Sequence, residues 1–99
     1  MMEYQIKKAI VDGLLKVVDN SPILKKSQNV FDDKKEEYEI WLKYVFSTLD
    51  IVGEYVSYSF LIMARNEIKH IDTNKTTYFE KINSICKILL NLAEQILSM

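Results

Sequence analysis

The chain has 99 residues, of which 48% are hydrophobic and 27% charged, with a net charge of −1 and a pI near 5.8. This is the size and composition of one globular domain, so we expect residues 1–99 to form a single domain rather than a disordered chain. The charge balance excludes a broad basic surface for gripping duplex DNA. A single cysteine, Cys86, excludes an internal disulfide and a cysteine-based zinc site.

The location of the protein is suggested by what interrupts its apolar segments. Charged residues such as Lys7 and Asp12 break the apolar pattern at the N-terminus, which does not read as a signal peptide. The most apolar stretch, residues 45–64, contains Asp50 and Glu54 and therefore fails as a membrane span. We expect a cytoplasmic protein with no membrane contact.

The first expected helix runs from about residue 3 to residue 19. Its apolar residues recur three or four positions apart, which is the spacing of one helix face. Gly13 interrupts this helix and would let a neighbouring helix approach closely. Pro22, after Asn20 and Ser21, ends it. The stripe contains Ile6, Ile10, Val11, Leu14, Leu15 and Val18.

The second expected helix begins at Asp33, which forms a capping-box pattern with Glu36 after a connector at residues 23–32. Its apolar phase passes through Gly53 without a break, so we favour one helix of nearly 40 residues, from 33 to about 70. The alternative is two helices joined near Gly53. The stripe contains Tyr38, Trp41, Leu42, Val45, Phe46, Leu49, Val52, Val56, Phe60 and Met63, and we expect Tyr44, Tyr55 and Tyr58 to be core or interface residues as well.

The last expected helix follows a polar turn at residues 72–75, and Thr77 with Glu80 forms its capping box. Its apolar surface is wide, which indicates burial on more than one side. We therefore predict an all-α, up-and-down bundle with three principal helices, one of them long and central, in which dimerisation completes a four-helix-like core. The core stripe of this helix contains Phe79, Ile82, Ile85, Cys86, Leu89, Ala93 and Ile96.

The segment Arg65-Asn66-Glu67-Ile68-Lys69-His70 holds the only arginine and the only histidine of the chain. Arginine binds phosphate through a planar fork, and histidine moves a proton near neutral pH. Successive helical residues turn by about 100°, so Asn66 and His70 share a face whereas Arg65 and His70 lie ~140° apart. Convergence requires the helix to end near His70 or Arg65 to reach around it, and a second subunit could form the opposite wall of the cleft.

This segment resembles the signature of the HEPN family, small all-helical proteins in which Arg, commonly followed by Asn, Asp or His, precedes a His by four to six residues. The resemblance covers the motif and the helix order of the C-terminal half. It implies a homodimeric, metal-independent ribonuclease of toxin or defence type, with RNA as substrate and no cofactor. His70 would be the general acid or base, Arg65 would hold the scissile phosphate, and Asn66 would orient one of them. Asp72 stands where related toxins often carry a modified tyrosine.

A second class of function also fits the sequence. In it the protein is a non-catalytic bundle that binds a protein partner, as an inactive HEPN relative, an antitoxin or a phage or mobile-element inhibitor. Arg65 would then pair with a carboxylate such as Glu67 or Glu80, and His70 would be a helix-end residue favoured by the dipole. The enzyme requires Arg65, Asn66 and His70 to converge in an open cleft. The binding protein requires an exposed patch elsewhere, with Arg65 and His70 apart or paired.

Overall fold

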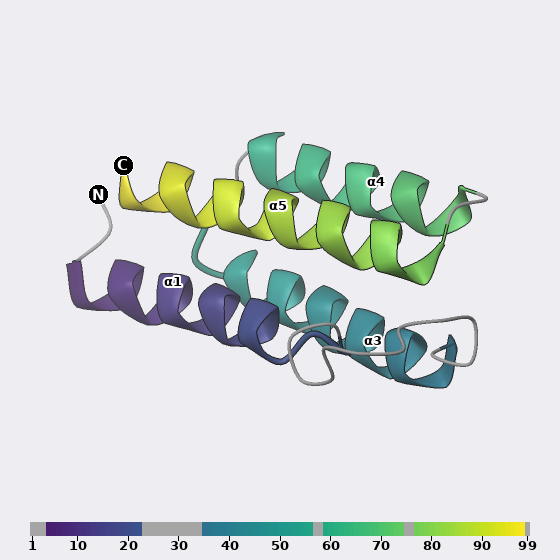
Figure 1. Cartoon of the computed structure of the whole chain (residues 1–99). Helices are drawn as coiled ribbons and strands as arrows, with labels where there is room; N and C mark the ends of the chain where they lie inside the picture. Colours follow the sequence, from purple (N-terminus) through teal and green to yellow (C-terminus); the bar gives the residue numbers. More distant parts are fainter. Residues whose placement is uncertain (1–3, 23–34, 57–58, 75–76, 99) are drawn as a thin grey trace.

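The computed structural model describes residues 4–22, 35–56, 59–74 and 77–98. These residues form helices and no strand, and successive helices run antiparallel, so that α1 begins and α5 ends at the same end of the bundle (Figure 1). The expected all-α, up-and-down bundle is confirmed. The helices are α1 (Tyr4–Asp19), α3 (Lys35–Val52), α4 (Ser59–Thr73) and α5 (Tyr78–Leu97).

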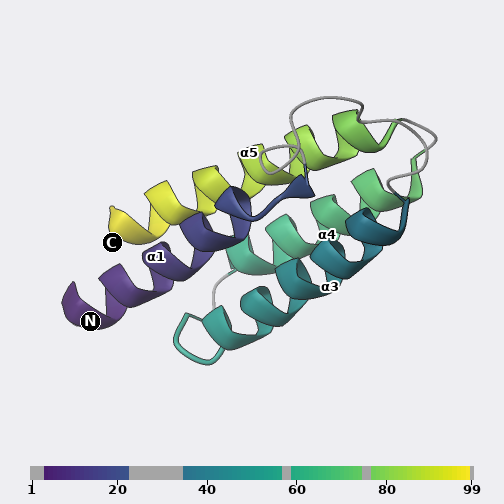
Figure 2. The same cartoon turned by 60° about the horizontal axis from the view of Figure 1, so that its bottom comes forward.

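The expectation of one long central helix is wrong. α3 ends at Val52, and α4 runs back beside it from Ser59 (Figure 2). The last helical hydrogen bonds lie just beyond this end. The Gly53 N–H donates to the Leu49 carbonyl and the Val56 N–H donates to the Val52 carbonyl, each at 2.9 Å. A continuous helix of that length would leave its second half without a packing partner in a chain this small. Folding back lets both halves of the apolar stripe share one core, and packing of that kind supplies most helix stability.

One chain therefore contributes all four helices of the bundle. α1 and α4 each pack against both α3 and α5. The expected arrangement of three principal helices is corrected to four in the described residues, which form a four-helix core within one chain. A dimer would have to use an outer face of the bundle instead.

The core lies between the inner faces of the four helices, where the periodicity of the sequence predicts it. Cys86 is half-buried against this core, as expected of a small apolar residue, and burial raises the pKa of its thiol. The apolar stripes predicted from the sequence are wrong at their edges, because four of their residues are exposed: Ile6, Leu15, Met63 and Phe79. The fully buried side chains include Leu14, Val17, Tyr38, Val45, Leu49, Ile68, Ile82, Ile85, Leu89 and Ile96.

One end of the bundle is closed by hydrogen bonds between three helices. The Tyr38 hydroxyl of α3 donates to Asp72 Oδ1 of α4 at 2.8 Å, and Lys81 Nζ of α5 donates to the Asp72 carbonyl at 2.9 Å. The ammonium of Lys81 also lies 5.7 Å from the centre of the Tyr38 ring. Burial, and then the hydrogen bond to the Asp72 carboxylate, raise the pKa of Tyr38 above its ordinary value.

The capping prediction for the last helix is confirmed. The hydroxyl of Thr77 accepts from the Glu80 N–H at 3.1 Å, and the carboxylate of Glu80 accepts from the Thr77 N–H at 3.4 Å. The capping box predicted at Asp33 and the connector at 23–32 lie outside the described residues. Within the described ranges, no helix is long and apolar enough to cross a membrane.

Candidate functional site

Arg65 is held against α3. Its Nη1 atom lies 2.6 Å from Asp50 Oδ1, and the centre of its guanidinium lies 5.2 Å from the centre of the Phe46 ring. The side chain of Arg65 is 35% exposed and that of Asp50 is 65% exposed, so water screens the pair and it contributes little to stability. The carboxylate partner is therefore neither Glu67 nor Glu80, the two candidates that the sequence suggested.

Asn66 and His70 lie one helical turn apart and are both exposed. Neither side chain has a hydrogen-bond partner among the residues that the structure describes. The backbone carbonyl of His70 accepts from the Thr73 hydroxyl at 3.0 Å, in the last turn of α4. Arg65 faces α3 from a different side of the same straight helix. One chain therefore brings Asn66 and His70 together but does not bring Arg65 to them.

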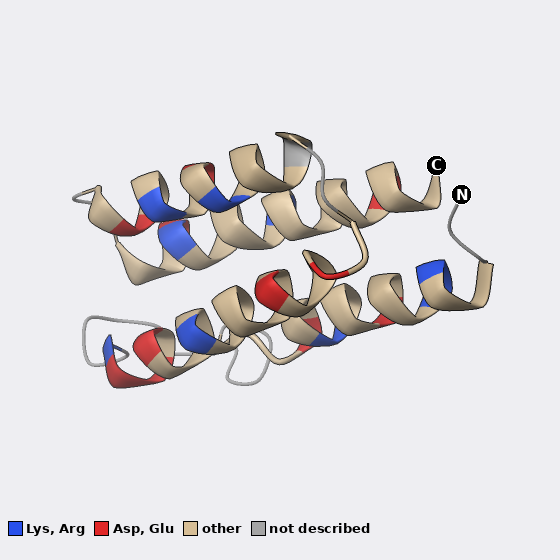
Figure 3. Cartoon of the chain, turned by 180° about the vertical axis from the view of Figure 1, so that it is seen from behind, with Lys and Arg blue, Asp and Glu red and all other residues tan. Residues whose placement is uncertain are grey.

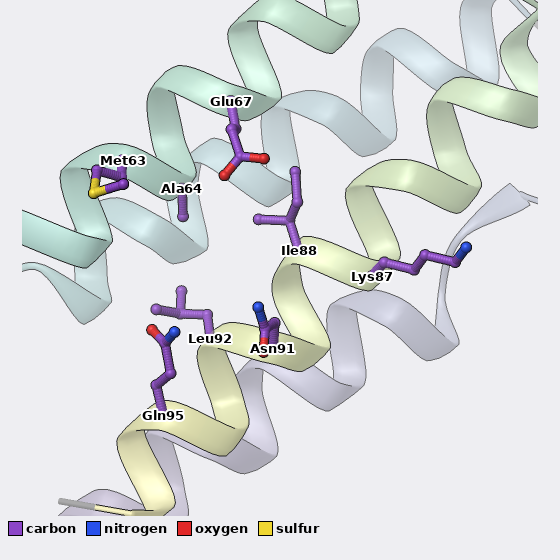
Figure 4. Close-up of a pocket in the computed structure, with 8 residues that line it drawn as sticks. All are labelled: Met63, Ala64, Glu67, Lys87, Ile88, Asn91, Leu92 and Gln95. Carbon is purple, nitrogen blue, oxygen red and sulfur yellow. The ribbon is translucent and has the colours of Figure 1, made fainter.

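A cleft of about 230 Å³ lies between α4 and α5. Glu67, from the middle of the Arg65–His70 segment, lines it, but Arg65 and His70 do not. Figure 4 shows the carboxylate of Glu67 reaching from α4 over Ile88 of α5, with the amides of Asn91 and Gln95 farther along the same side of α5. The remaining lining residues are Met63, Ala64, Lys87 and Leu92.

A second cleft, of about 430 Å³, lies where α3 meets the end of α4. Its charged lining residues are three carboxylates, Glu36, Glu39 and Asp72, and one cation, Lys43. A surplus of negative charge repels phosphate, so this cleft does not suit RNA. Figure 3 agrees with this on the larger scale, because acidic and basic segments share the same helices and no helix is covered by basic residues.

The third cleft is an apolar groove of about 430 Å³ between α1 and α3. One wall is formed by Tyr44 and Ile51 of α3 and by Tyr55 of the turn that follows it, which are 40%, 57% and 55% exposed. No heavy atom outside the backbone of its own helix lies within 4 Å of the position that a Cβ on Gly13 would take, so the α1 wall is open there. The groove is lined by Ile6, Ala9, Ile10, Gly13, Tyr44, Thr48, Ile51, Val52 and Tyr55, and we call it the α1–α3 groove.

Sequence reasoning missed this groove, although part of its signal is visible in the sequence. Tyr44, Thr48 and Ile51 follow three/four spacing on a second face of α3, beside the core stripe, and Tyr55 continues the spacing into the turn after α3. Tyr44 and Tyr55 were expected in a core or an interface, and the structure places both at the surface. Gly13 was expected to admit a neighbouring helix, and no described helix of this chain fills the space beside it.

The described part of the chain contains no cluster of three or more His, Cys, Asp or Glu side chains that could hold a metal ion. Comparison with protein-family models, with curated proteins and with solved structures finds no match to this chain. The geometry of the three clefts and of the Arg65 segment is therefore the basis on which a function is proposed.

Proposed function

We propose that this protein acts by binding another protein chain in the α1–α3 groove and not by catalysis. The observation that carries the proposal is the groove itself, because Tyr44, Ile51 and Tyr55 expose apolar area beside the open surface at Gly13. Covering such area stabilises a complex by roughly 25 cal/mol for each Å² removed from water. Tyrosine is enriched at interfaces because its ring is apolar while its hydroxyl remains satisfied at the rim.

The state of the Arg65 segment supports the same proposal. A catalytic arginine must have its guanidinium free for phosphate, and here Asp50 takes it at 2.6 Å. A histidine that serves the same phosphate must face the same cleft, and His70 lies on another side of α4, ~140° around the helix from Arg65. Separation of Arg65 from His70, pairing of Arg65 with a carboxylate and an apolar patch elsewhere all support a binding protein, which requires the patch together with either the separation or the pairing.

The shape of the groove indicates a helical partner. Its two walls are antiparallel helices, so a third helix can lie along both and insert side chains between them. The groove-facing residues of α3 recur at three and four positions, which matches the spacing of side chains on such a helix.

The test uses two isoleucines of similar exposure. Ile51, in the groove, is 57% exposed, and Ile62, on the outer side of α4, is 62% exposed. The wild type, Ile51→Asp and Ile62→Asp are used to capture proteins from a lysate of the cells that make this protein. Capture by the wild type and by Ile62→Asp, but not by Ile51→Asp, supports binding in the groove. Equal capture by all three variants removes the groove from the function.

A second candidate function is a HEPN-like, metal-independent ribonuclease, and one observation favours it. Asn66 and His70 are solvent-exposed on one side of α4, and the ion pair that holds Arg65 is an exposed one, worth ~0–1 kcal/mol, which a phosphate can displace. A second subunit facing α4 would have to supply the other half of the site.

The ribonuclease hypothesis has its own test. RNA is incubated in EDTA with the wild type, Arg65→Ala, Asn66→Ala and His70→Ala. Cleavage by the wild type that leaves cyclic phosphate ends, and that Arg65→Ala and His70→Ala both abolish, would establish His70 as general acid or base and Arg65 as the phosphate ligand. Absence of cleavage by the folded wild type leaves the binding function.

A further inference from the structure

We propose that the occupant of the α1–α3 groove is a second copy of this chain, related by a two-fold axis that sets the two α3 helices antiparallel. The inference rests on the proposed function, since it names the partner of the same groove. It differs from a dimer that completes the bundle core, because each chain already contributes four helices to its own core.

The first support is the symmetry of the α3 wall. In a two-fold interface every contact occurs twice: if one residue contacts a second residue of the partner subunit, the second residue also contacts the first residue of the partner subunit. Tyr44, Thr48 and Ile51 of α3 and Tyr55 of the turn that follows it are spaced four, three and four residues apart, so the spacing is the same in both directions about its centre. In an antiparallel pair, Tyr44 lies opposite Tyr55 of the partner subunit, and Thr48 lies opposite Ile51 of the partner subunit. Within α3 itself, the spacing of Tyr44, Thr48 and Ile51 is also that of a coiled-coil seam.

The second support is charge. Lys43 and Glu54 each precede one of the two groove tyrosines, and both are exposed. Lys43 lies on α3 and Glu54 in the turn that follows it, and their midpoint in the sequence lies within one residue of the centre of the stripe. The antiparallel arrangement therefore brings Lys43 near Glu54 of the partner subunit twice. A parallel arrangement would instead place the two Glu54 carboxylates side by side.

The third support is the opening at Gly13. A ring of the partner subunit, from Tyr44 or Tyr55, can lie over this residue, since nothing outside its own helix backbone approaches within 4 Å of a Cβ position there. An aromatic side chain typically buries 150–250 Å² at such a contact. Each subunit both supplies tyrosines and offers the space beside a glycine, so the same contact forms twice.

The experiment measures the dimer dissociation constant of the full-length chain by sedimentation equilibrium. Lys43→Glu and Glu54→Lys each create two like-charge pairs across the interface, and we expect each to weaken the dimer by about tenfold. The double variant Lys43→Glu/Glu54→Lys reverses both members of each pair, and we expect it to restore the wild-type constant. Ile51→Asp abolishes the dimer, whereas Ile62→Asp leaves it unchanged. Circular dichroism establishes that every variant is folded.

The outcomes separate the two proposals. Lack of restoration in the charge-reversed double variant, or a dimer that survives Ile51→Asp, overturns the two-fold arrangement. If the wild type is monomeric but captures another protein, and Ile51→Asp does not capture it, the groove is a binding site whose occupant is not a second copy of this chain. If the wild type is monomeric and Ile51→Asp captures the same proteins as the wild type, both the binding function of the groove and the second copy are overturned.

Discussion

α3 carries aromatic residues on two faces that differ in what their polar atoms do. On the core face, Tyr38 and Trp41 are 2% and 4% exposed, and their hydroxyl and Nε1 groups donate to Asp72 and to the Val17 carbonyl. On the groove face, Tyr44 of α3 and Tyr55 of the turn that follows it are 40% and 55% exposed, and neither hydroxyl has a hydrogen-bond partner within the described ranges.

This difference in hydrogen bonding separates aromatic residues that stabilise the fold from aromatic residues that remain available for contact with a partner. A buried polar atom without a partner costs free energy, so the core face accepts Tyr38 and Trp41 only together with their acceptors. At the surface water satisfies a hydroxyl, so Tyr44 and Tyr55 need no partner in the monomer. The comparison therefore predicts that the two faces respond differently to the same substitutions.

The largest effect is expected at Trp41. Trp41→Ala leaves a cavity between α1 and α3 and removes the donor to the Val17 carbonyl, so we expect the free energy of unfolding to fall by about 3–5 kcal/mol. Urea denaturation followed by circular dichroism measures it. Tyr44→Ala is the control on the other face and should cost under about 1 kcal/mol. A similar loss of unfolding free energy in Trp41→Ala and Tyr44→Ala would show that the core face and the groove face do not differ in this way.

A smaller loss is expected from removing one oxygen. Tyr38→Phe keeps the buried ring but removes the hydrogen bond to Asp72, so we expect a cost of roughly 1–2 kcal/mol. Tyr44→Phe removes a hydroxyl that only water satisfies and should change the free energy of unfolding by less than about 0.5 kcal/mol. A double variant, Tyr38→Phe/Asp72→Ala, tests whether the two residues act through each other, since their effects should then not add.

The same hydroxyl predicts a pH dependence on the alkaline side. In the unfolded chain Tyr38 loses its proton near the ordinary tyrosine pKa of 10.0, whereas the folded state keeps it well above that value. The folded state therefore binds more protons above pH 10, so the contribution of Tyr38 to stability is complete below that pH and is lost as the pH rises. Thermal unfolding measured from pH 8 upward should show a steeper decline in the wild type than in Tyr38→Phe.

On the groove face, Gly13→Ala should separate stability from binding. The position is helical and open, so alanine should raise the free energy of unfolding by about 0.5–1 kcal/mol. The added methyl group would occupy the space where we place a partner ring, so the dimer should weaken although the subunit becomes more stable. Thermal denaturation and sedimentation equilibrium of one preparation measure the two effects. A variant with higher stability and unchanged association would show that no ring lies over Gly13.

The smallest effect is expected at the ion pair on the far side of α3. Arg65→Ala and Asp50→Ala should each lower the free energy of unfolding by no more than about 1 kcal/mol, because both side chains are exposed. The loss should also shrink as salt is added, since salt screens exposed charges. A loss of several kcal/mol in either variant would mean that the pair, and not the core face alone, holds α3 against α4.

Much of the fold could be predicted from local pattern. The three/four spacing located the core positions of α1, α3 and α5, and the Thr77–Glu80 pair located the start of α5, because both signals depend on residues within one or two helical turns. The reversal after Val52 could not be found in this way. The apolar phase is the same whether the helix continues or folds back, and the choice depends on what the second half can pack against.

The candidate site was predictable only in part for the same reason. Spacing alone placed Asn66 and His70 on one side of a helix and Arg65 on another, and the structure has that arrangement. The partner of Arg65 was not predictable, because Asp50 lies 15 residues away on α3 and faces it only after the chain reverses. The HEPN resemblance remains a prediction, and the cleavage assay with Arg65→Ala and His70→Ala tests it.

What the sequence by itself determined is therefore local: the helical class, the core-facing positions and the cap of α5, all of which follow from periodicity and nearby hydrogen bonds. Tertiary structure alone decided the contacts between distant segments. It set Tyr38 beside Asp72, 34 residues on, and it left α1 and α3 with an apolar groove that no other described element covers. The physical reason is that packing chooses among chain paths that share the same helices, and the surface left uncovered depends on that choice.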